Sequence, residues 1–195
     1  MTFYRLFPFD RDASARSEGG PLFVARHLQG GGRHDNPGAY GALYVSRSTI
    51  SPIAEHLSMW RSWGAAGSAF RPESRSLALV AFEDTGLDTL VDLDDPRILL
   101  DRELRPSGVA TRERRITRPL AKALYDEGVM GFEWWSTIEA SWINATLFAD
   151  RALDRLKFAD EPEILTIQHP LVQEAAETVG VRLVASGRES ATNQA

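Results

Sequence analysis

GGGRHDNPGAYGALYVSRSTISPIAE is the sequence of residues 30–55, and three kinds of local structure follow one another within it. The glycines, asparagine and proline of residues 30–38 predict a turn-rich loop, because these residues interrupt helices and strands. The run ALYVS at 42–46 predicts a strand, since it is rich in apolar and β-forming residues. From Ile50 onward apolar side chains recur every three or four residues, which predicts a helix that ends at Gly64.

The rest of the chain mixes strands and helices without a regular strand–helix–strand rhythm. This mixture predicts one α+β domain over residues 1–185 rather than a doubly wound parallel sheet, with a flexible tail at 186–195. Further strands are predicted at residues 3–7, 22–28, 76–83, 129–136 and 164–167, with a return to the sheet at 181–184, and further helices at 117–127 and 170–179.

Composition limits the classes of function. The 195 residues carry a formal net charge of -5 and no cysteine, which argues against nucleic acid or an anionic membrane as the main partner and excludes disulfides and thiolate chemistry. The N-terminal residues lack the apolar run of a signal peptide, so we expect a cytoplasmic protein. The basic cluster at 111–118 is expected to be a solvated face or loop, with phosphate or partner contact as the alternative.

Several standard motifs are missing. Arg33-His34 stands where a Walker A loop needs Gly-Lys-Ser/Thr, and the glycines at 30–32 lack the third spaced glycine of a dinucleotide fingerprint. There is no Gly-x-Ser-x-Gly elbow. The histidines are scattered without an i, i+4 pair, so no metal site is expected.

Arg33, Tyr44 and Glu55 are the candidate site residues, one from each part of the opening segment. A guanidinium in a glycine-framed turn can pair with phosphate, and an aromatic face can stack on a flat ring. A carboxylate can stabilise an oxocarbenium-like sugar. Together these properties suit cleavage of an N-glycosidic bond in a nicotinamide nucleotide.

Each candidate also has a purely structural interpretation. Arg33 could brace the loop, Tyr44 could belong to the core, and Glu55 could be a solvated helix residue opposite the apolar face. Spacing alone leaves these alternatives open.

The same residues resemble the RES family, whose members include toxins of bacterial toxin–antitoxin pairs. The similar runs are GGRHDNPG at 31–38, ALYVS at 42–46, IAE at 53–55, GFEWWS at 131–136 and NATLF at 144–148. The resemblance implies a compact α+β fold similar to ADP-ribosyltransferase toxins, with a mixed, mainly antiparallel sheet surrounded by helices. It also implies NAD as the substrate and an Xre-like helix-turn-helix antitoxin as partner. Whether this chain forms a homo-oligomer inside that complex stays open.

The resemblance assigns roles to particular residues. It implies that Arg33 holds the NAD phosphates or ribose, that Tyr44 packs on nicotinamide and that Glu55 stabilises the ribosyl cation. Ser136 takes the position of the family's serine and supports the pocket by hydrogen bonding. Gly32 and Asn144 lie in the similar runs and are counted with the NAD-binding residues, whereas no residue is assigned to a metal.

The resemblance leads to an NAD-cleaving, toxin-like enzyme, with water or phosphate as the acceptor of ADP-ribose. Two alternatives stay open. One is transfer of ADP-ribose to a protein, and the other is a non-catalytic nucleotide- or partner-binding protein with the same fold.

Overall fold

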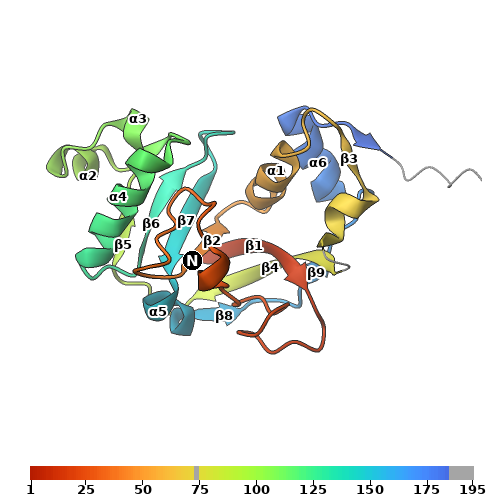
Figure 1. Cartoon of the computed structure of the whole chain (residues 1–195), viewed down its shortest axis with the longest axis horizontal. Helices are drawn as coiled ribbons and strands as arrows, with labels where there is room; N and C mark the ends of the chain where they lie inside the picture. Colours follow the sequence, from red (N-terminus) through yellow and green to blue (C-terminus); the bar gives the residue numbers. More distant parts are fainter. Residues whose placement is uncertain (73–74, 185–195) are drawn as a thin grey trace, which may run out of the picture.

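A computed structural model describes residues 1–72 and 75–184. Its main sheet has the strand order β5-β6-β7-β2-β1-β4-β8, and β9 pairs with β4 beside β8 (Figure 1). Neighbouring strands are antiparallel except β5 and β6, which are parallel. The strands are β1 (Thr2–Phe9), β2 (Ala42–Ser46), β4 (Ser76–Asp84), β5 (Leu90–Asp92), β6 (Gly131–Trp135), β7 (Ile143–Phe148), β8 (Leu156–Phe158) and β9 (Glu163–Ile164).

The helices gather in two groups beside this sheet (Figure 1). One group lies next to β5 and β6, and its members are α2 (Pro96–Asp101), α3 (Pro106–Val109) and α4 (Arg114–Asp126). The other group consists of α1 (Ile50–Ser58) and α6 (Pro170–Val179), which contact each other closely. The short α5 (Ala149–Ala152) follows β7, and β3 (Ala65–Ala66) and β10 (Leu183–Val184) form a separate parallel pair. The α+β class and the mainly antiparallel sheet predicted from the sequence are confirmed.

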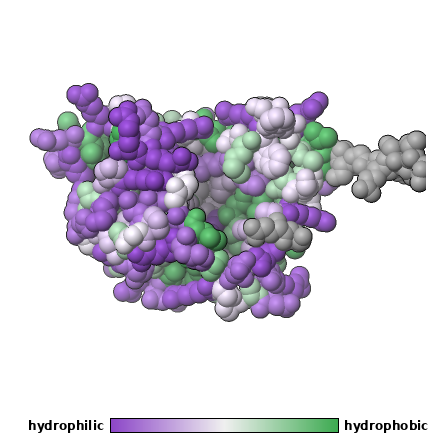
Figure 2. All heavy atoms as spheres, in the orientation of Figure 1, coloured by the Kyte–Doolittle hydropathy of each residue, from purple (hydrophilic) through white to green (hydrophobic). Residues whose placement is uncertain are grey.

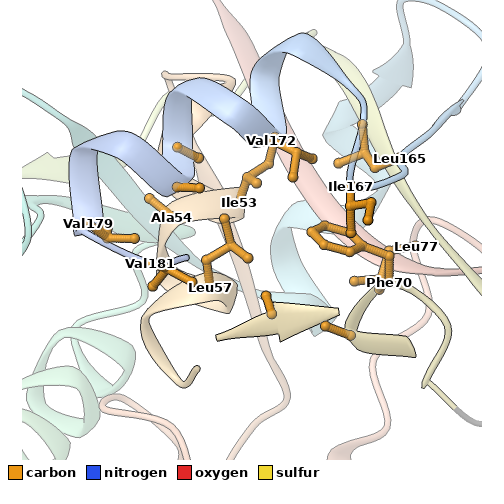
Figure 3. Packing of buried hydrophobic residues seen from close by; sticks show 14 of the residues in the cluster. Ile53, Ala54, Leu57, Phe70, Leu77, Leu165, Ile167, Val172, Val179 and Val181 are labelled. Carbon is orange, nitrogen blue, oxygen red and sulfur yellow. The ribbon is translucent and has the colours of Figure 1, made fainter. Parts of the chain in front are cut away.

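The pairing of α1 with α6 follows from the apolar spacing of the sequence. Ile53, Ala54 and Leu57 are fully buried on the face of α1 that contacts α6. Val172 is also fully buried and lies in the same cluster (Figure 3). Gly180, with a positive φ of 66°, ends α6 as a left-handed cap. This apolar contact fixes α1 against α6.

Strand β2 separates two apolar clusters by its alternating side chains. Leu43 and Val45 belong to a cluster with Phe3 and Phe82 on one face of the sheet. Tyr44 points to the other face, where it packs against a cluster that includes residues of α4. The strand therefore presents Tyr44 toward the glycine-rich loop and α4.

The first two strand predictions need correction. Strand β1 runs through Pro8, which pairs with Leu77 of β4, whereas the pairing of β1 with β2 joins Tyr4 to Ser46 near its other end. A proline without an N–H group is tolerated where a strand has a partner on one side. The predicted strand at 22–28 is wrong, because this segment contains a short 3-10 turn, and the Phe23 carbonyl accepts a hydrogen bond from Arg5.

Three further boundaries also differ from the predictions. Helix α1 ends at Ser58, five residues before Trp63, whose side chain is 80% exposed and outside the core. Helix α4 begins at Arg114, before the predicted start at 117. The return to a sheet after α6 is made by β10, which pairs with β3 and not with the main sheet. The tail predicted at 186–195 lies outside the described residues.

Candidate active site

The glycine-rich loop is closed around the side chain of Asp35. The Asp35 carboxylate accepts hydrogen bonds from the amides of Gly30 (2.8 Å) and Gly32 (2.6 Å), and from the hydroxyl of Tyr44 (2.7 Å). Asp35 is only 4% exposed. A Cβ atom on Gly32 would lie 2.5 Å from both Asp35 Oδ1 and the Tyr44 hydroxyl. Glycine is therefore required at position 32 for this closure.

The Tyr44 hydroxyl is part of the same network. Besides donating to Asp35, it accepts a hydrogen bond from the backbone amide of His34 at 3.0 Å. Burial and the adjacent Asp35 carboxylate raise the pKa of Tyr44, so the phenol stays protonated. Its ring lies roughly parallel to that of His34, with centroids 6.2 Å apart. The polar end of Tyr44 thus holds the loop.

Thr146, on β7, connects the glycine-rich loop to the sheet. It pairs with Tyr44 across β2 and β7, and its Oγ1 contacts His34 Nδ1 at 2.8 Å and Trp134 Nε1 at 3.1 Å. His34 is 2% exposed, and burial holds its pKa well below the ordinary 6.5, with the charge of Arg33 acting in the same direction. The histidine is therefore neutral and structural at neutral pH.

Arg33 extends from this loop over an aromatic ring. Its guanidinium carbon lies 4.3 Å from the centroid of the Trp134 ring, and its Nη2 donates to the Val109 carbonyl at 2.7 Å. Burial lowers the pKa of Arg33, and the charge of Glu55 opposes this shift. The cation–π contact and the carbonyl bond fix the direction of the guanidinium.

Glu55 lies on the side of α1 that does not face α6. Its Oε1 accepts a hydrogen bond from Asn144 Nδ2 at 3.0 Å, and Asn144 Oδ1 in turn accepts from the hydroxyl of Ser51 at 2.8 Å. Glu55 reaches solvent, but it stands in a recess where burial raises the pKa of its carboxyl. Arg33, the Asn144 hydrogen bond and Arg112 act against that rise. The carboxylate is thus oriented by a buried amide and accessible from one side.

A pocket of about 330 Å³ brings these parts together. It lies between α1 and the beginning of α4, and the surface is hollowed between the two groups of helices in Figure 2. Hydrophilic side chains cover the helices α2–α4 on this face, whereas the surface over α1 and α6 has mixed hydropathy. The lining residues are Arg33, Glu55, Ser58, Arg112, Arg114, Thr137 and Ile138.

A family model covers most of the chain. The family model of the RES domain matches residues 2–168, which contain every residue that lines the pocket. The chain belongs to the RES domain family. No curated protein matches the sequence.

A solved structure with the same fold comes from a protein complex. This RES domain is similar to a chain in the crystal structure of the MbcT-MbcA toxin–antitoxin complex of M. tuberculosis, with a TM-score of 0.62. The two sequences are 19% identical, and the similarity covers 92% of this chain and 89% of the other. At this identity the comparison shows a common fold. The predicted family and the predicted resemblance to the fold of its toxins are confirmed.

The structure separates the predicted site residues of the RES domain into three positions. Arg33 and Glu55 line the same pocket, and Asn144 contacts Glu55 directly. Tyr44 and Gly32 lie behind Arg33 in the loop network. The sixth predicted residue, Ser136, does not line the pocket, but the next two residues, Thr137 and Ile138, do.

Ser136 directly follows strand β6 and is 3% exposed. Its Oγ accepts a hydrogen bond from the amide of Ile138 at 3.1 Å, and its own amide donates to the Trp142 carbonyl at 2.8 Å. Thr137 and Ile138 then line the pocket. The serine shapes the turn that forms one wall of the pocket.

Asp35 and Thr146 were not among the predicted site residues. Arg112 and Arg114 were predicted only as part of the basic cluster at 111–118, with phosphate or partner contact as the alternative to a solvated face or loop. The signal for Asp35 was present, because aspartates in glycine-rich turns often accept hydrogen bonds from nearby amides. Thr146 could be found only after β2 and β7 were paired. Within residues 1–72 and 75–184, no group of three or more acidic or histidine side chains is arranged to hold a metal ion, and no helix there is long and apolar enough to cross a bilayer.

Proposed function

We propose that this RES domain is a toxin-type enzyme that binds NAD in the pocket beside Glu55 and breaks the bond between nicotinamide and ribose. The observation that carries the proposal is the position of Glu55. Its carboxylate is oriented by Asn144, accessible from the pocket, and faces a wall that contains Arg33. A fixed carboxylate beside a cationic wall suits a substrate with a cationic nicotinamide–ribose end and an anionic diphosphate.

The chemistry requires stabilisation of positive charge on the ribose. When the bond between ribose C1′ and the nicotinamide nitrogen breaks, its electron pair leaves with the nitrogen, so nicotinamide departs neutral and the sugar becomes an oxocarbenium ion. The ionised Glu55 carboxylate stabilises this cation. Water then adds to C1′ and releases a proton to solvent, which gives ADP-ribose.

Burial and the neighbouring charges both act on the Glu55 carboxylate. Burial strengthens the interaction of the carboxylate with a developing cation, because less water screens it. The same burial raises the pKa of Glu55, but Arg33, Asn144 and Arg112 favour the ionised form. Burial is the larger influence, so the pKa stays above its ordinary value, and these three groups limit the rise.

Arg33 and Tyr44 hold the rest of the substrate in this proposal. The Arg33 guanidinium, fixed by Trp134 and the Val109 carbonyl, directs its free donors toward a phosphate or ribose oxygen. Tyr44 does not line the pocket itself; its half-buried ring lies behind Arg33, and its hydroxyl is bound to Asp35. In this proposal the ring borders the nicotinamide next to Arg33.

The similar fold in a toxin–antitoxin complex supports a partner for this protein. We propose that the partner is a small antitoxin, of the Xre-like helix-turn-helix type, that covers the pocket and prevents NAD from entering. Release of the antitoxin would then allow depletion of cellular NAD.

Nicotinamide release by purified protein tests the enzymatic proposal. Glu55→Gln keeps the size of the side chain and removes its charge, so we expect the rate to fall by about 100-fold or more. Glu177→Gln, an exposed position on α6, is the matched control and should behave as wild type. If wild type and Glu55→Gln release nicotinamide equally slowly, the proposal is wrong.

The products identify the acceptor. Free ADP-ribose indicates hydrolysis, a phosphorylated ADP-ribose in phosphate buffer indicates phosphorolysis, and label on protein in a lysate indicates transfer to a protein. Loss of growth on expression of wild type but not of Glu55→Gln would connect the activity to a toxin role.

A further inference from the structure

The residues that line the pocket have a net positive charge. Three guanidinium groups and one carboxylate line it. Arg112 is close enough to Arg33 and Glu55 for its charge to act on both: it adds to the lowering of the Arg33 pKa and opposes the rise of the Glu55 pKa that burial causes. Like charges gathered in one recess repel each other, and an anion that enters removes this repulsion.

Arg112 and Arg114 are the members of this set that have no structural task. Arg33 is held by Trp134 and Val109. Arg112 has a long contact from Nε to the Thr137 hydroxyl, at 3.4 Å. Neither Arg112 nor Arg114 forms an ion pair with an acidic residue of the described chain, and both are exposed.

Other arginines of the same short segment behave differently. Arg115 forms an ion pair with Glu113 and does not line the pocket. Arg118 points to the glycine-rich loop, where it donates to the carbonyls of Gly30 and Gly32. Arg112 and Arg114 therefore line the pocket. Arg115 is instead neutralised by Glu113, and Arg118 braces the glycine-rich loop.

We infer that Arg112 and Arg114 are the phosphate-binding residues of this pocket and take the diphosphate of the dinucleotide substrate. This inference rests on the proposed function and names the part of the substrate that Arg112 and Arg114 recognise. Glu55 on α1 faces the ribose, and the two arginines at the start of α4 face the diphosphate. Planar guanidinium groups bind phosphate oxygens in pairs, which suits two arginines and two phosphates.

A free phosphate ion has the same chemistry and is the other source of such a ligand. A diphosphate is favoured because there are two arginines and both line the same pocket as Glu55. A separate phosphate ion bound beside the substrate would leave the charge of the substrate's diphosphate to Arg33 alone.

Calorimetric titration with ADP-ribose tests the inference without turnover. We expect Arg112→Gln and Arg114→Gln each to weaken ADP-ribose binding about 10-fold, the size of one charge-assisted hydrogen bond at an accessible site. Arg115→Gln, which changes the same residue type in the same segment, should bind as wild type. Thermal unfolding of all three variants checks that each is folded.

A second arm titrates inorganic phosphate and follows nicotinamide release. If the arginine variants bind ADP-ribose as wild type but lose a stimulation of NAD cleavage by phosphate, the ligand is a free phosphate and the inference is wrong. If wild type binds ADP-ribose through both arginines but releases no nicotinamide, the binding inference stands and the enzymatic proposal fails. Equal ADP-ribose binding by wild type and both variants, or no binding by wild type, overturns the inference.

Discussion

Two walls of the pocket, helix α1 and the glycine-rich loop, are held in place by different forces. Helix α1, which carries Glu55, is fixed by apolar side chains that pack against α6 (Figure 3). The glycine-rich loop, which carries Arg33, is fixed by hydrogen bonds to buried polar groups, chiefly Asp35 and Thr146. Apolar contacts tolerate a range of geometries at a cost in stability, whereas a buried hydrogen-bond network allows one geometry. We therefore expect changes behind α1 to reduce stability most, and changes in the loop to alter the site.

Leu57→Ala tests the apolar wall and should have the largest effect on stability. Leu57 is fully buried between α1 and its neighbours, so its truncation leaves a cavity and should lower the free energy of unfolding by about 3 kcal/mol. Urea denaturation followed by circular dichroism measures this loss. If Leu57→Ala lowers the free energy of unfolding by less than Gly32→Ala does, this comparison of the two walls is wrong.

Gly32→Ala tests the loop. Because a Cβ atom at this position would stand 2.5 Å from Asp35 Oδ1 and from the Tyr44 hydroxyl, the loop must open, at a cost of about 2 kcal/mol. We expect nicotinamide release to fall as well, since Arg33 follows directly. Gly31→Ala is the control, because no atom lies within 4 Å of its added Cβ. Equal activity of the two variants would show that the closed loop is not needed.

The pH dependence of stability distinguishes the walls in another way. His34 is neutral in the folded protein because burial holds its pKa well below 6.5, whereas in the unfolded chain it gains a proton as the pH falls through 6.5. Its contribution to stability is therefore complete above that pH and is lost below it, by at most about 1.4 kcal/mol per pH unit.

The measurement is the slope of unfolding free energy against pH, between about pH 5 and 6.5. His34→Gln should show a smaller slope than wild type, whatever its absolute stability. Leu57→Ala is the control and should keep the wild-type slope. A His34→Gln slope equal to that of wild type would mean that the loop histidine is not buried as described.

Tyr44→Phe should have the smallest effect. The change removes the hydroxyl that joins Asp35 to the His34 amide, so we expect a loss of about 1 kcal/mol. The ring stays, and nicotinamide release should therefore stay within about threefold of wild type under the proposed role of the ring. A loss of activity as large as that of Glu55→Gln would instead assign a chemical role to the hydroxyl.

Local sequence patterns predicted much of the fold. The boundaries of β2 and α6 were predicted correctly, because alternating or helical spacing and a terminal glycine mark them. The errors arose where long-range contacts decide. Segment 22–28 has strand-like composition, yet the Phe23 carbonyl bonds to Arg5 and the segment does not join the sheet. The first strand was predicted to stop at residue 7, before Pro8, because the sequence does not show that this end of β1 has a sheet partner on one side only.

The sequence by itself determined the α+β class, the glycine-rich loop and the candidate residue types Arg33, Tyr44 and Glu55, because composition and spacing act locally. The tertiary structure decided which of these residues meet. It placed Asn144, 89 residues from Glu55 in the chain, against that carboxylate, and turned Tyr44 from a solitary aromatic residue into a support for the loop. It also directed Arg112 and Arg114 of a basic segment into the pocket. These relations depend on strand pairing and helix packing between distant segments, and no short pattern encodes them.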